Sequence, residues 1–488
     1  MIHLLILTAD AAPNESRNLF GLRTLGPSKI SWSVRKHGYN SITLARLQLL
    51  EEDEIINIAQ SLLNEKTIIG VSTSFLNPLS ILNNKLNPTN TADKIIIKLI
   101  NVVNKLRSRY NNKVVVGGSI GKFYHDIFNA DKSFDGGAEN EIVQYLDRHF
   151  RSGIQKIPYD WDIQNCNFRW HTSDIIQSKE ALPLEISRGC IFNCKFCTYS
   201  EIGKKKGTYE RNINEIRNEI IYNYDNFGST HYWLASDTFN DNDERMNEWC
   251  EMIESLPFNI YYSCFLRLDL AYKHLATTKR LYQCGMRGAH FGVETFHPQS
   301  AKSIGKSFNG IYGKSALEKI FYDTFESNVA TTTTMIVGLP YETIESVYDS
   351  VRWYSEHKHI NTSFIPLTLI NHNVIPEEKL RSNEFSRNIQ KYNYRFENND
   401  IYDWKSELMN FSDAKKISGD ISNILNNFDS LDCWFGLVHL AVSDKTPKYF
   451  FENKANLVRQ TTRPHIESIN KNYFNLLKDY VNTLVSNN

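Results

Sequence analysis

The chain has 488 residues, and its 55 lysines and arginines balance 55 aspartates and glutamates, so the formal net charge is zero. A neutral chain argues against general binding of nucleic acid or anionic membranes, because both draw affinity from positive charge. A local basic groove stays open as an alternative. Hydrophobic residues make up 41% and aromatic residues 12%, which excludes a disordered chain. No apolar run approaches the roughly 18 residues of a membrane-spanning helix.

The first ten residues, MIHLLILTAD, contain an apolar run that invites comparison with a signal peptide. The run lacks a basic flank, stops at Asp10, and is followed by no small-residue cleavage pattern. A buried first β-strand fits better, and we therefore expect a cytoplasmic protein.

Residues 1–150 are predicted to form a Rossmann-like, doubly wound α/β domain, because short β-branched runs alternate with helical segments. Strands are expected at residues 4–7, 42–44, 68–71 and 114–116. Small residues follow two of them: Ser72 follows one, and Gly117 and Gly118 follow another. In open α/β sheets ligands bind beyond the carboxyl ends of the strands. The pattern fits either such a ligand site or tight turns without a ligand.

Residues 151–180 are predicted to be a linker, and a second β/α series follows over residues 181–375. Its expected strands lie near residues 184–187, 231–235, 259–265, 288–293, 331–337 and 362–367. Six β/α units are too few for an eight-fold barrel, so we expect a partial (β/α)6 TIM-type barrel. From residue 376 to 488 the strand signal fades, and a helical carboxyl-terminal region is expected.

Three of the eight cysteines lie within eight residues, in the pattern C-x3-C-x2-C formed by Cys190, Cys194 and Cys197. Thiolates are soft ligands that suit iron–sulfur clusters or zinc. Three thiolates leave one iron of a cubane cluster without a protein ligand, and an open position is typical of catalytic metal sites. The alternative is a zinc site that takes its fourth ligand from His171 or His231. The other five cysteines are scattered and do not support a second cluster.

The segment from Ser187-Arg188-Gly189-Cys190 to Phe196-Cys197 resembles the signature of the radical S-adenosylmethionine (SAM) superfamily. The resemblance implies a [4Fe–4S] cluster on the three cysteines, and a free iron that binds the amino and carboxylate groups of SAM. One electron would then cleave SAM to a 5′-deoxyadenosyl radical, while Phe196 packs beside the adenine. An electron donor such as flavodoxin or ferredoxin is implied, and no catalytic residue is assigned beyond the cluster ligands.

Further segments in the barrel resemble SAM-contacting elements of the same superfamily. The residues implied are Ser236, Asp237, Arg267, Glu294 and Gly338. Ser236 and Asp237 would lie near the amino group of SAM, Arg267 would pair with its carboxylate, and Glu294 would contact it. Gly338 opens Gly-Leu-Pro-Tyr-Glu-Thr, in which Tyr341 replaces the usual glycine. Each also has a structural alternative: a helix cap for Asp237, an ion pair for Arg267, and a buried amide partner for Glu294.

The first domain resembles the cobalamin-binding domain of one radical SAM subclass, on Gly70-Val71-Ser72-Thr73-Ser74 and Val116-Gly117-Gly118. The resemblance places cobalamin, if it binds, at Ser72, Gly117 and Gly118. The loop Thr8-Ala9-Asp10-Ala11-Ala12-Pro13 has no Asp-x-His-x-x-Gly, so the histidine that some cobalamin proteins place on cobalt is missing. Cobalamin without protein ligation and a domain without cofactor both stay open.

The sequence thus predicts a radical SAM enzyme, with cobalamin-dependent methyl transfer to carbon or phosphorus, or a related tailoring reaction, as the favoured outcome. One alternative is a radical SAM enzyme that abstracts hydrogen without cobalamin. Another is a cluster- or zinc-bearing binding protein without turnover. The neutral charge favours a small-molecule or peptide substrate over nucleic acid, and no motif identifies that substrate.

Overall fold

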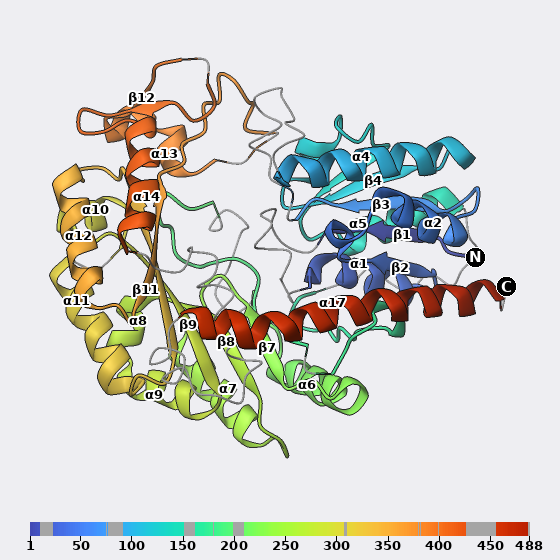
Figure 1. Ribbon diagram of the computed structural model, residues 1–488, viewed down its shortest axis with the longest axis horizontal. Helices are drawn as coiled ribbons and strands as arrows, with labels where there is room; N and C mark the ends of the chain where they lie inside the picture. Colours follow the sequence, from blue (N-terminus) through green and yellow to red (C-terminus); the bar gives the residue numbers. More distant parts are fainter. Residues whose placement is uncertain are drawn as a thin grey trace. The chain divides into compact units, whose positions relative to one another are not determined.

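The computed structural model describes residues 1–9, 23–74, 76, 91–150, 162–178, 180–198, 209–306, 310–378, 380, 382–398, 400–425 and 455–486 (Figure 1). The chain divides into two compact units. The first comprises Met1–Pro183, Tyr222–Ser229 and Arg463–Asn488, and the second comprises Leu184–Ile221 and Thr230–Thr462. The boundaries expected from the sequence near residues 150, 180 and 375 stay predictions.

A five-stranded parallel sheet forms the centre of the first unit, with the order β2-β1-β3-β4-β5. The strands are β1 (Leu4–Leu7), β2 (Ser41–Leu44), β3 (Ile68–Ser72), β4 (Val114–Gly118) and β5 (Lys132–Asp135). The helices are α1 (Leu25–Lys36), α2 (Glu52–Leu62), α4 (Thr91–Tyr110) and α5 (Glu139–Phe150), with short 3-10 turns η2 (Leu47–Leu49), η3 (Gly121–Tyr124) and η4 (Thr172–Asp174). This arrangement confirms the doubly wound domain.

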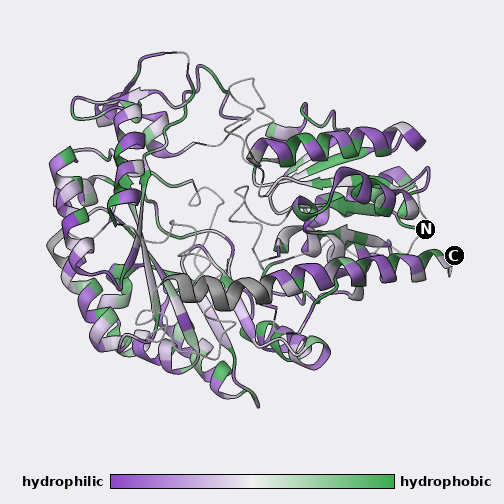
Figure 2. Cartoon of the chain, viewed as in Figure 1, coloured by the Kyte–Doolittle hydropathy of each residue, from purple (hydrophilic) through white to green (hydrophobic). Residues whose placement is uncertain are grey.

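Alternate residues of the strands enter two separate hydrophobic cores, one on each face of the sheet. Leu5 and Leu7 of β1 belong to one core, whereas Leu4 and Ile6 belong to the other. Because both faces are covered, β1 is hydrophobic at every position, and strands of the first unit appear green in Figure 2. The strand order reverses between β1 and β3, so a ligand crevice of this fold lies at their carboxyl ends.

The last helix of the chain, α17 (Ala455–Ser486), contributes its carboxyl-terminal half to the first unit. Tyr473, Leu477 and Val481 are buried in the same core as Leu5 and Leu7. A helix near residues 466–485 was expected from the sequence, but its packing against the first sheet was not.

Six parallel strands in the order β11-β10-β9-β8-β7-β6 form the second sheet. The strands are β6 (Leu182–Glu185), β7 (His231–Ala235), β8 (Tyr261–Leu266), β9 (Met286–Glu294), β10 (Ala330–Val337) and β11 (Asn361–Pro366). Their spatial order equals their order in the chain, so every crossover moves one strand further in the same direction. This is the connectivity of the partial (β/α)6 barrel that the sequence predicts.

Helices follow the strands of this barrel in turn. They are α6 (Ile213–Phe227), α7 (Asp243–Glu254), α8 (Leu268–Lys273), α9 (Leu275–Gln283), α10 (Pro298–Ser303), α11 (Gly310–Glu318), the π-helical turn η6 (Lys319–Thr324) and α12 (Ile344–Glu356). After β11 the chain forms α13 (Glu384–Arg387), η7 (Ile389–Tyr392), the antiparallel pair β12 (Arg395–Phe396) and β13 (Trp404–Lys405), and α14 (Phe411–Leu425).

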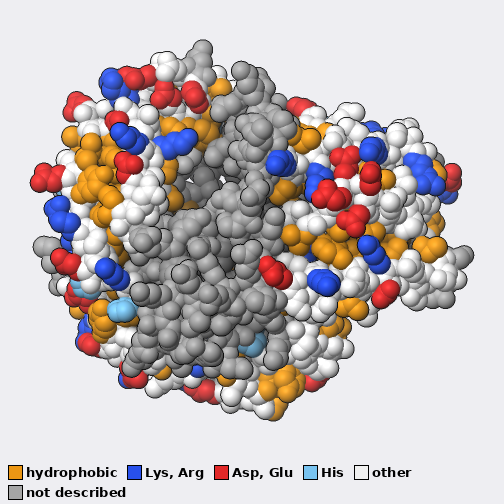
Figure 3. Space-filling model, in the orientation of Figure 1, with side chains coloured by type: hydrophobic (Ala, Val, Ile, Leu, Met, Phe, Trp, Pro, Cys, Tyr) orange, Lys and Arg blue, Asp and Glu red, His pale blue; other side chains and the backbone are white. Residues whose placement is uncertain are grey.

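No helix in the described part of the chain is long and apolar enough to cross a membrane. On the face shown in Figure 3, acidic and basic side chains of the described residues are interspersed. This mixture agrees with the zero net charge and shows no concentrated basic surface among the described residues of that face.

Candidate active site

The three cysteines lie on a loop that leaves the barrel after β6. Cys194 is buried, Cys190 and Cys197 are half-buried, and none of the three is in a disulfide. The backbone N–H of Cys197 donates to the carbonyl of Cys194 at 3.0 Å, which makes a tight turn between these two residues. Gly189 has a φ of 77°, which a residue with a side chain adopts only with strain, so glycine suits the sharp start of this loop.

The two ends of the cysteine loop are tied together. Ser187 and Glu210 form an isolated antiparallel bridge. The N–H of Arg188 donates to the carbonyl of Tyr209 at 3.0 Å, and the N–H of Arg211 donates to the carbonyl of Ile186 at 2.9 Å. The chain beyond the cysteines thus returns to pair with the chain before them, and this pairing fixes where the loop begins and ends.

Polar groups from the next two strands contact the thiols. Thr238, which follows β7, has its hydroxyl oxygen 3.3 Å from the sulfur of Cys190. Arg267, which follows β8, has Nη1 3.6 Å from the sulfur of Cys194. The hydroxyls of Ser187 and Ser236 are 2.7 Å apart. The carboxyl ends of β6, β7 and β8 therefore meet at the cysteine loop, where barrel enzymes place their sites.

Several contacts fix the orientation of Arg267. Its Nη2 and Nε donate to the two carboxylate oxygens of Asp269 at 2.7 and 3.0 Å. Its guanidinium carbon lies 4.0 Å from the ring centroid of Phe192. Its backbone N–H donates to Asn240 Oδ1 at 2.7 Å, and Asn240 Nδ2 donates back to its carbonyl at 2.9 Å. The ion pair considered for Arg267 exists, and it holds Nη1 on the side of Cys194.

Glu294 ends β9 with a φ of 68° and a buried side chain. Burial raises the pKa of this carboxyl, while the ammonium of Lys306, 3.5 Å from Oε1, opposes that shift. A Cβ on Gly292 would lie 2.6 Å from Glu294 Oε1, so a side chain there would displace the carboxylate from its present position. The Gly-x-Glu spacing thus has a steric reason in this chain.

Gly338 and Glu342 form a second hydrogen-bonded group, at the carboxyl end of β10. The N–H of Gly338 donates to Glu342 Oε2 at 3.1 Å, and the hydroxyl of Thr295 donates to Oε1 at 2.8 Å. Burial raises the pKa of Glu342 to about 7. Tyr341, which lies between Gly338 and Glu342 in the sequence, has a φ of 65° and an exposed side chain. The tyrosine therefore keeps the left-handed backbone conformation that suits the glycine it replaces.

Not every predicted residue is brought into one group. Asp237 is half-buried, and the helix it was considered to cap, α7, is capped by Asn242 instead. Phe196 is half-buried, and its carbonyl accepts a hydrogen bond from Asn383 at 2.9 Å. The direct thiol contacts belong to Thr238 and Arg267, while Glu294 and Gly338 lie at the ends of the next two strands.

Sequence reasoning missed a polar group on the barrel wall. His290 lies between two threonines of β10, with Nδ1 2.7 Å from the hydroxyl of Thr332 and Nε2 2.8 Å from that of Thr334. Thr333 contacts Tyr354 of the surrounding helix α12, so Thr332 and Thr334 face the opposite side, toward the barrel interior. Burial lowers the pKa of His290 to about 4, and the imidazole is therefore neutral at pH 7. Only strand pairing, which the sequence does not show, brings these residues together.

The donor set fits an iron–sulfur cluster, since three thiols that form no disulfide lie on one short loop beside an arginine and a hydroxyl. Within the described residues, however, no three or more His, Cys, Asp or Glu side chains are grouped closely enough to hold a metal ion. Binding of a cluster therefore requires the thiols to turn toward a common point.

The residues predicted for cobalamin lie at the carboxyl ends of β3 and β4. The hydroxyl of Thr73 donates to the carbonyl of Gly117 at 3.1 Å, and Ser72 Oγ lies 3.4 Å from Ser74 Oγ. Gly118 has a φ of 144°, and a Cβ there would lie 2.5 Å from Thr73 Oγ1. Packing between the strand ends therefore explains this glycine without a ligand. Residues 10–13, which lack the histidine motif, fall outside the described residues.

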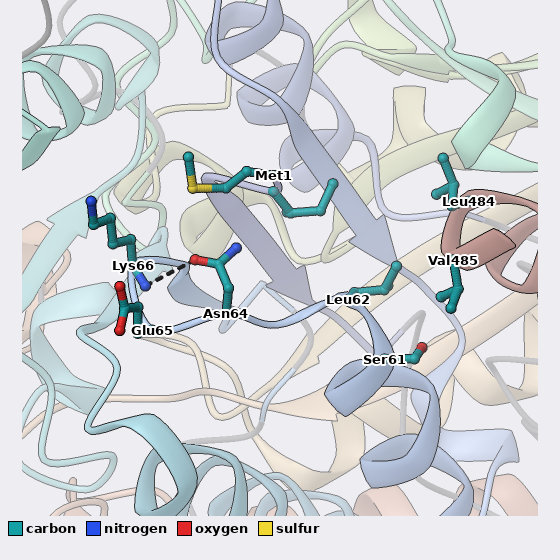
Figure 4. A pocket seen from close by; sticks show the side chains of 9 residues that line it. Met1, Ser61, Leu62, Asn64, Glu65, Lys66, Leu484 and Val485 are labelled. Carbon is teal, nitrogen blue, oxygen red and sulfur yellow. Dashed lines mark hydrogen bonds between the residues drawn. The ribbon is translucent and has the colours of Figure 1, made fainter. Parts of the chain in front are cut away.

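A cavity of about 540 Å³ opens elsewhere on the first unit (Figure 4). Met1 and Ile2, which precede β1, and Asn64 to Lys66, which precede β3, line it together with Leu484 and Val485 of α17. It therefore lies at the amino-terminal edge of the sheet, opposite the end that carries Ser72. This cavity is not the cofactor crevice that the sequence predicts.

The segment that contains the cysteine loop is similar to known proteins. Residues 184–354 match the family model of the radical SAM superfamily. A segment of 170 residues is 28% identical to an uncharacterized methyltransferase of Pyrococcus horikoshii, and it covers 34% of this chain and 35% of that protein. The matched part thus spans about a third of the relative's length.

Two solved structures share the fold. One is the radical SAM methyltransferase TsrM from Kitasatospora setae with cobalamin and a [4Fe–4S] cluster bound, with a TM-score of 0.56, 13% identity and 76% of each chain covered. The other is the cobalamin-dependent radical SAM enzyme OxsB with aqua-cobalamin bound, with a TM-score of 0.54, 14% identity, and 80% of this chain and 56% of that chain covered. At these identities the similarity shows the fold alone.

Proposed function

We propose that the chain is an enzyme that cleaves SAM reductively on a [4Fe–4S] cluster held by Cys190, Cys194 and Cys197, because residues 184–354 match the family model of the radical SAM superfamily. The observation that carries this proposal is the contact of two of these thiols with Thr238 and Arg267, at the carboxyl ends of the next two strands. When bound, the cluster supplies the electron that splits SAM into methionine and a 5′-deoxyadenosyl radical.

The side chains of the barrel would hold and orient SAM. Arg267 would bind its carboxylate, because Asp269 fixes the guanidinium with Nη1 toward the cysteine loop. Ser236 and Asp237 would lie near the amino group, and Phe196 would pack beside the adenine. Glu294 and Gly338 would complete the site at the ends of β9 and β10.

The burial of these groups supports the proposal. Arg267 and Glu294 are 6% exposed, so water competes little for their hydrogen bonds. A site that excludes water also protects a reactive radical from side reactions. Both effects follow from the buried positions of Arg267 and Glu294 at the strand ends.

We extend the proposal to cobalamin-dependent methyl transfer, because two structures with the same fold contain cobalamin and one of them is a methyltransferase. When bound, cobalamin supplies a carrier for the methyl group. Ser72, Gly117 and Gly118 would line its site at the carboxyl ends of β3 and β4. The acceptor would be a small molecule or a peptide, and an external reductant of the flavodoxin or ferredoxin kind would supply electrons.

SAM cleavage by the reconstituted protein tests the central proposal. Anaerobic reconstitution with iron and sulfide, followed by reduction, should yield 5′-deoxyadenosine from SAM, and Cys194→Ala should lose both the iron and the product. Cys264→Ala is the matched control, because this buried thiol lies on β8 with its sulfur 3.5 Å from that of Met286, and should keep both. A wild-type protein that takes up iron but leaves SAM intact would show that the chain is a cluster-binding protein without this reaction.

Purification with added cobalamin separates the two enzyme reactions. Retained corrinoid absorbance, together with formation of S-adenosylhomocysteine, favours methyl transfer. The absence of both, with 5′-deoxyadenosine still formed, favours hydrogen abstraction without cobalamin.

A further inference from the structure

Lys195 connects the cysteine loop to other segments of the second unit through hydrogen bonds. It lies directly after Cys194 and two residues before Cys197. Its backbone N–H donates to the carbonyl of Ile304 at 3.0 Å, and its carbonyl accepts from the N–H of Phe385 at 3.2 Å. Its ammonium donates to Glu384 Oε2 at 2.5 Å. Every polar group of Lys195 is therefore bonded to a segment far away in the sequence.

Asn383 makes the neighbouring contact. Its Nδ2 donates to the carbonyl of Phe196 at 2.9 Å and to the carbonyl of Thr368 at 3.3 Å. Its Oδ1 accepts the N–H of Ser386 at 2.8 Å and so caps helix α13. Because Asn383 Oδ1 accepts this N–H, the orientation of the side-chain amide is fixed. Its Nδ2 then faces the carbonyls of Phe196 and Thr368. Asn383 thereby joins the cysteine loop to the chain that leaves β11.

The segment that carries Asn383 is itself firmly placed. Phe385 is fully buried, with its ring centroid 4.4 Å from that of Tyr392. The hydroxyl of Tyr392 donates to Glu384 Oε1 at 2.6 Å, so the carboxylate that meets Lys195 is held from its other side. The hydroxyl of Tyr394 donates to the carbonyl of Gly338 at 2.7 Å, which ties the segment to the end of β10.

We infer that Asn383 is a positioning residue, which with Lys195 and Glu384 preorganises the backbone of the cysteine loop for cluster binding. The inference rests on the proposed function for its purpose, but the clamp formed by residues 383–385 lies beyond the segment that matches the family. Ordering loop residues on binding costs conformational entropy. A backbone fixed before binding leaves only the thiol rotations to be ordered when the cluster enters.

Asn383→Asp separates the two roles of this side chain. Aspartate caps a helix as well as asparagine does, so α13 keeps its cap. The aspartate side chain has no N–H to donate, and it places a carboxylate oxygen next to the carbonyls of Phe196 and Thr368. Asn242→Asp is the matched control, because Asn242 Oδ1 caps α7 by accepting the N–H groups of Glu244 and Arg245, so the same exchange is made at the start of another helix.

The first readout uses the full chain without a cluster. Alkylation rates of Cys190, Cys194 and Cys197, resolved by peptide mass spectrometry, should rise at least about threefold in Asn383→Asp and stay at the wild-type value in Asn242→Asp, because one hydrogen bond is worth about that factor. The second readout is the loaded protein: Asn383→Asp should retain less iron, and its reduced cluster should give an altered electron paramagnetic resonance spectrum.

Alkylation of Asn383→Asp at the wild-type rate overturns the inference, even where wild-type protein binds iron and cleaves SAM. Conversely, a wild type without SAM cleavage defeats the proposed function, while the alkylation rates still decide the role of Asn383. If Asn383→Asp does not fold by circular dichroism, Asn383→Ser takes its place, because serine also caps the helix and also lacks the two amide donors. Asn383→Ser at the wild-type alkylation rate overturns the inference in the same way.

Discussion

Glu342 shows how a single residue in the barrel can make stability depend on pH. It is a buried carboxyl that accepts hydrogen bonds from Thr295 and from the N–H of Gly338. These bonds favour the ionised form, but burial outweighs them and raises its pKa from 4.5 to about 7. Between these two values the folded state holds a proton that the unfolded state has released. The folded state is therefore most favoured at low pH in this range.

We predict that the wild-type barrel loses stability relative to Glu342→Gln as the pH rises from 5 to 8, by about 1–3 kcal/mol, since one pKa unit corresponds to about 1.4 kcal/mol. Glutamine keeps the shape and carries no charge. Urea unfolding of both proteins at pH 5, 6, 7 and 8 measures the difference in unfolding free energy. A difference that stays constant over this range would show that Glu342 does not titrate there.

The cysteine loop could be predicted from the sequence because its three ligands lie within eight residues, and spacing alone carries the chemistry. Arg267 was predicted only because the segment that contains it resembles a SAM-contacting element, whereas Thr238, two residues beyond Ser236, was not predicted. Asn383 could not be found in this way, since it lies 187 residues from Phe196. It belongs to a segment with no motif. Contacts made by a single amide across such a separation leave no periodic or compositional signal.

At the scale of whole elements, the apolar runs of the barrel predict the strands within a few residues, because burial on both faces requires such runs. β5 and the pair β12 and β13 were not predicted by this reasoning, for two different reasons. β5 reads Lys-Ser-Phe-Asp and lies at a sheet edge, where polar residues are tolerated. The pair β12 and β13 has two residues in each strand, too few to produce alternation.

The packing of β13 on the end of β10 leads to a prediction about these two elements. Gly338 has a φ of 97°, and a Cβ there would lie 2.4 Å from Cη2 of Trp404, whose indole N–H donates to the carbonyl of Leu367 at 2.8 Å. We expect Gly338→Ala to destabilise the barrel by about 2–4 kcal/mol, through backbone strain and overpacking together. Thermal unfolding measures the effect.

Gly419 provides the control for this prediction, because it lies within α14 and a Cβ there would meet nothing within 4 Å. Gly419→Ala should stabilise the protein by about 0.5–1 kcal/mol, as expected of alanine in a helix interior. If Gly338→Ala unfolds at the wild-type temperature, Trp404 moves aside at little cost, and the two elements are packed less tightly than their distances indicate.

At the scale of the whole molecule, the last helix belongs with the first sheet. Arg23 and Arg46 both pair with the buried carboxylate of Glu180, and Arg46 also bonds Asn470 of α17. The ring of Tyr473 lies 5.3 Å from the guanidinium carbon of Arg23 and 5.5 Å from that of Arg46. The periodicity of residues 466–485 predicts a helix. Which sheet it covers depends on contacts between ends of the chain that periodicity does not encode.

We therefore predict that Tyr473→Ala destabilises the first unit by about 3–5 kcal/mol, because it leaves a cavity in the core of the first sheet and removes the ring beneath two buried guanidiniums. Tyr473→Phe keeps the ring and removes only the hydroxyl that accepts the N–H of Ala45 at 3.2 Å, so it should cost about 1 kcal/mol. Hydrogen exchange measured by mass spectrometry should show faster exchange in β1 to β4 of Tyr473→Ala and unchanged exchange in β7 to β10. Equal loss of protection in both sets of strands would mean that the two units unfold together, and that α17 stabilises the whole chain.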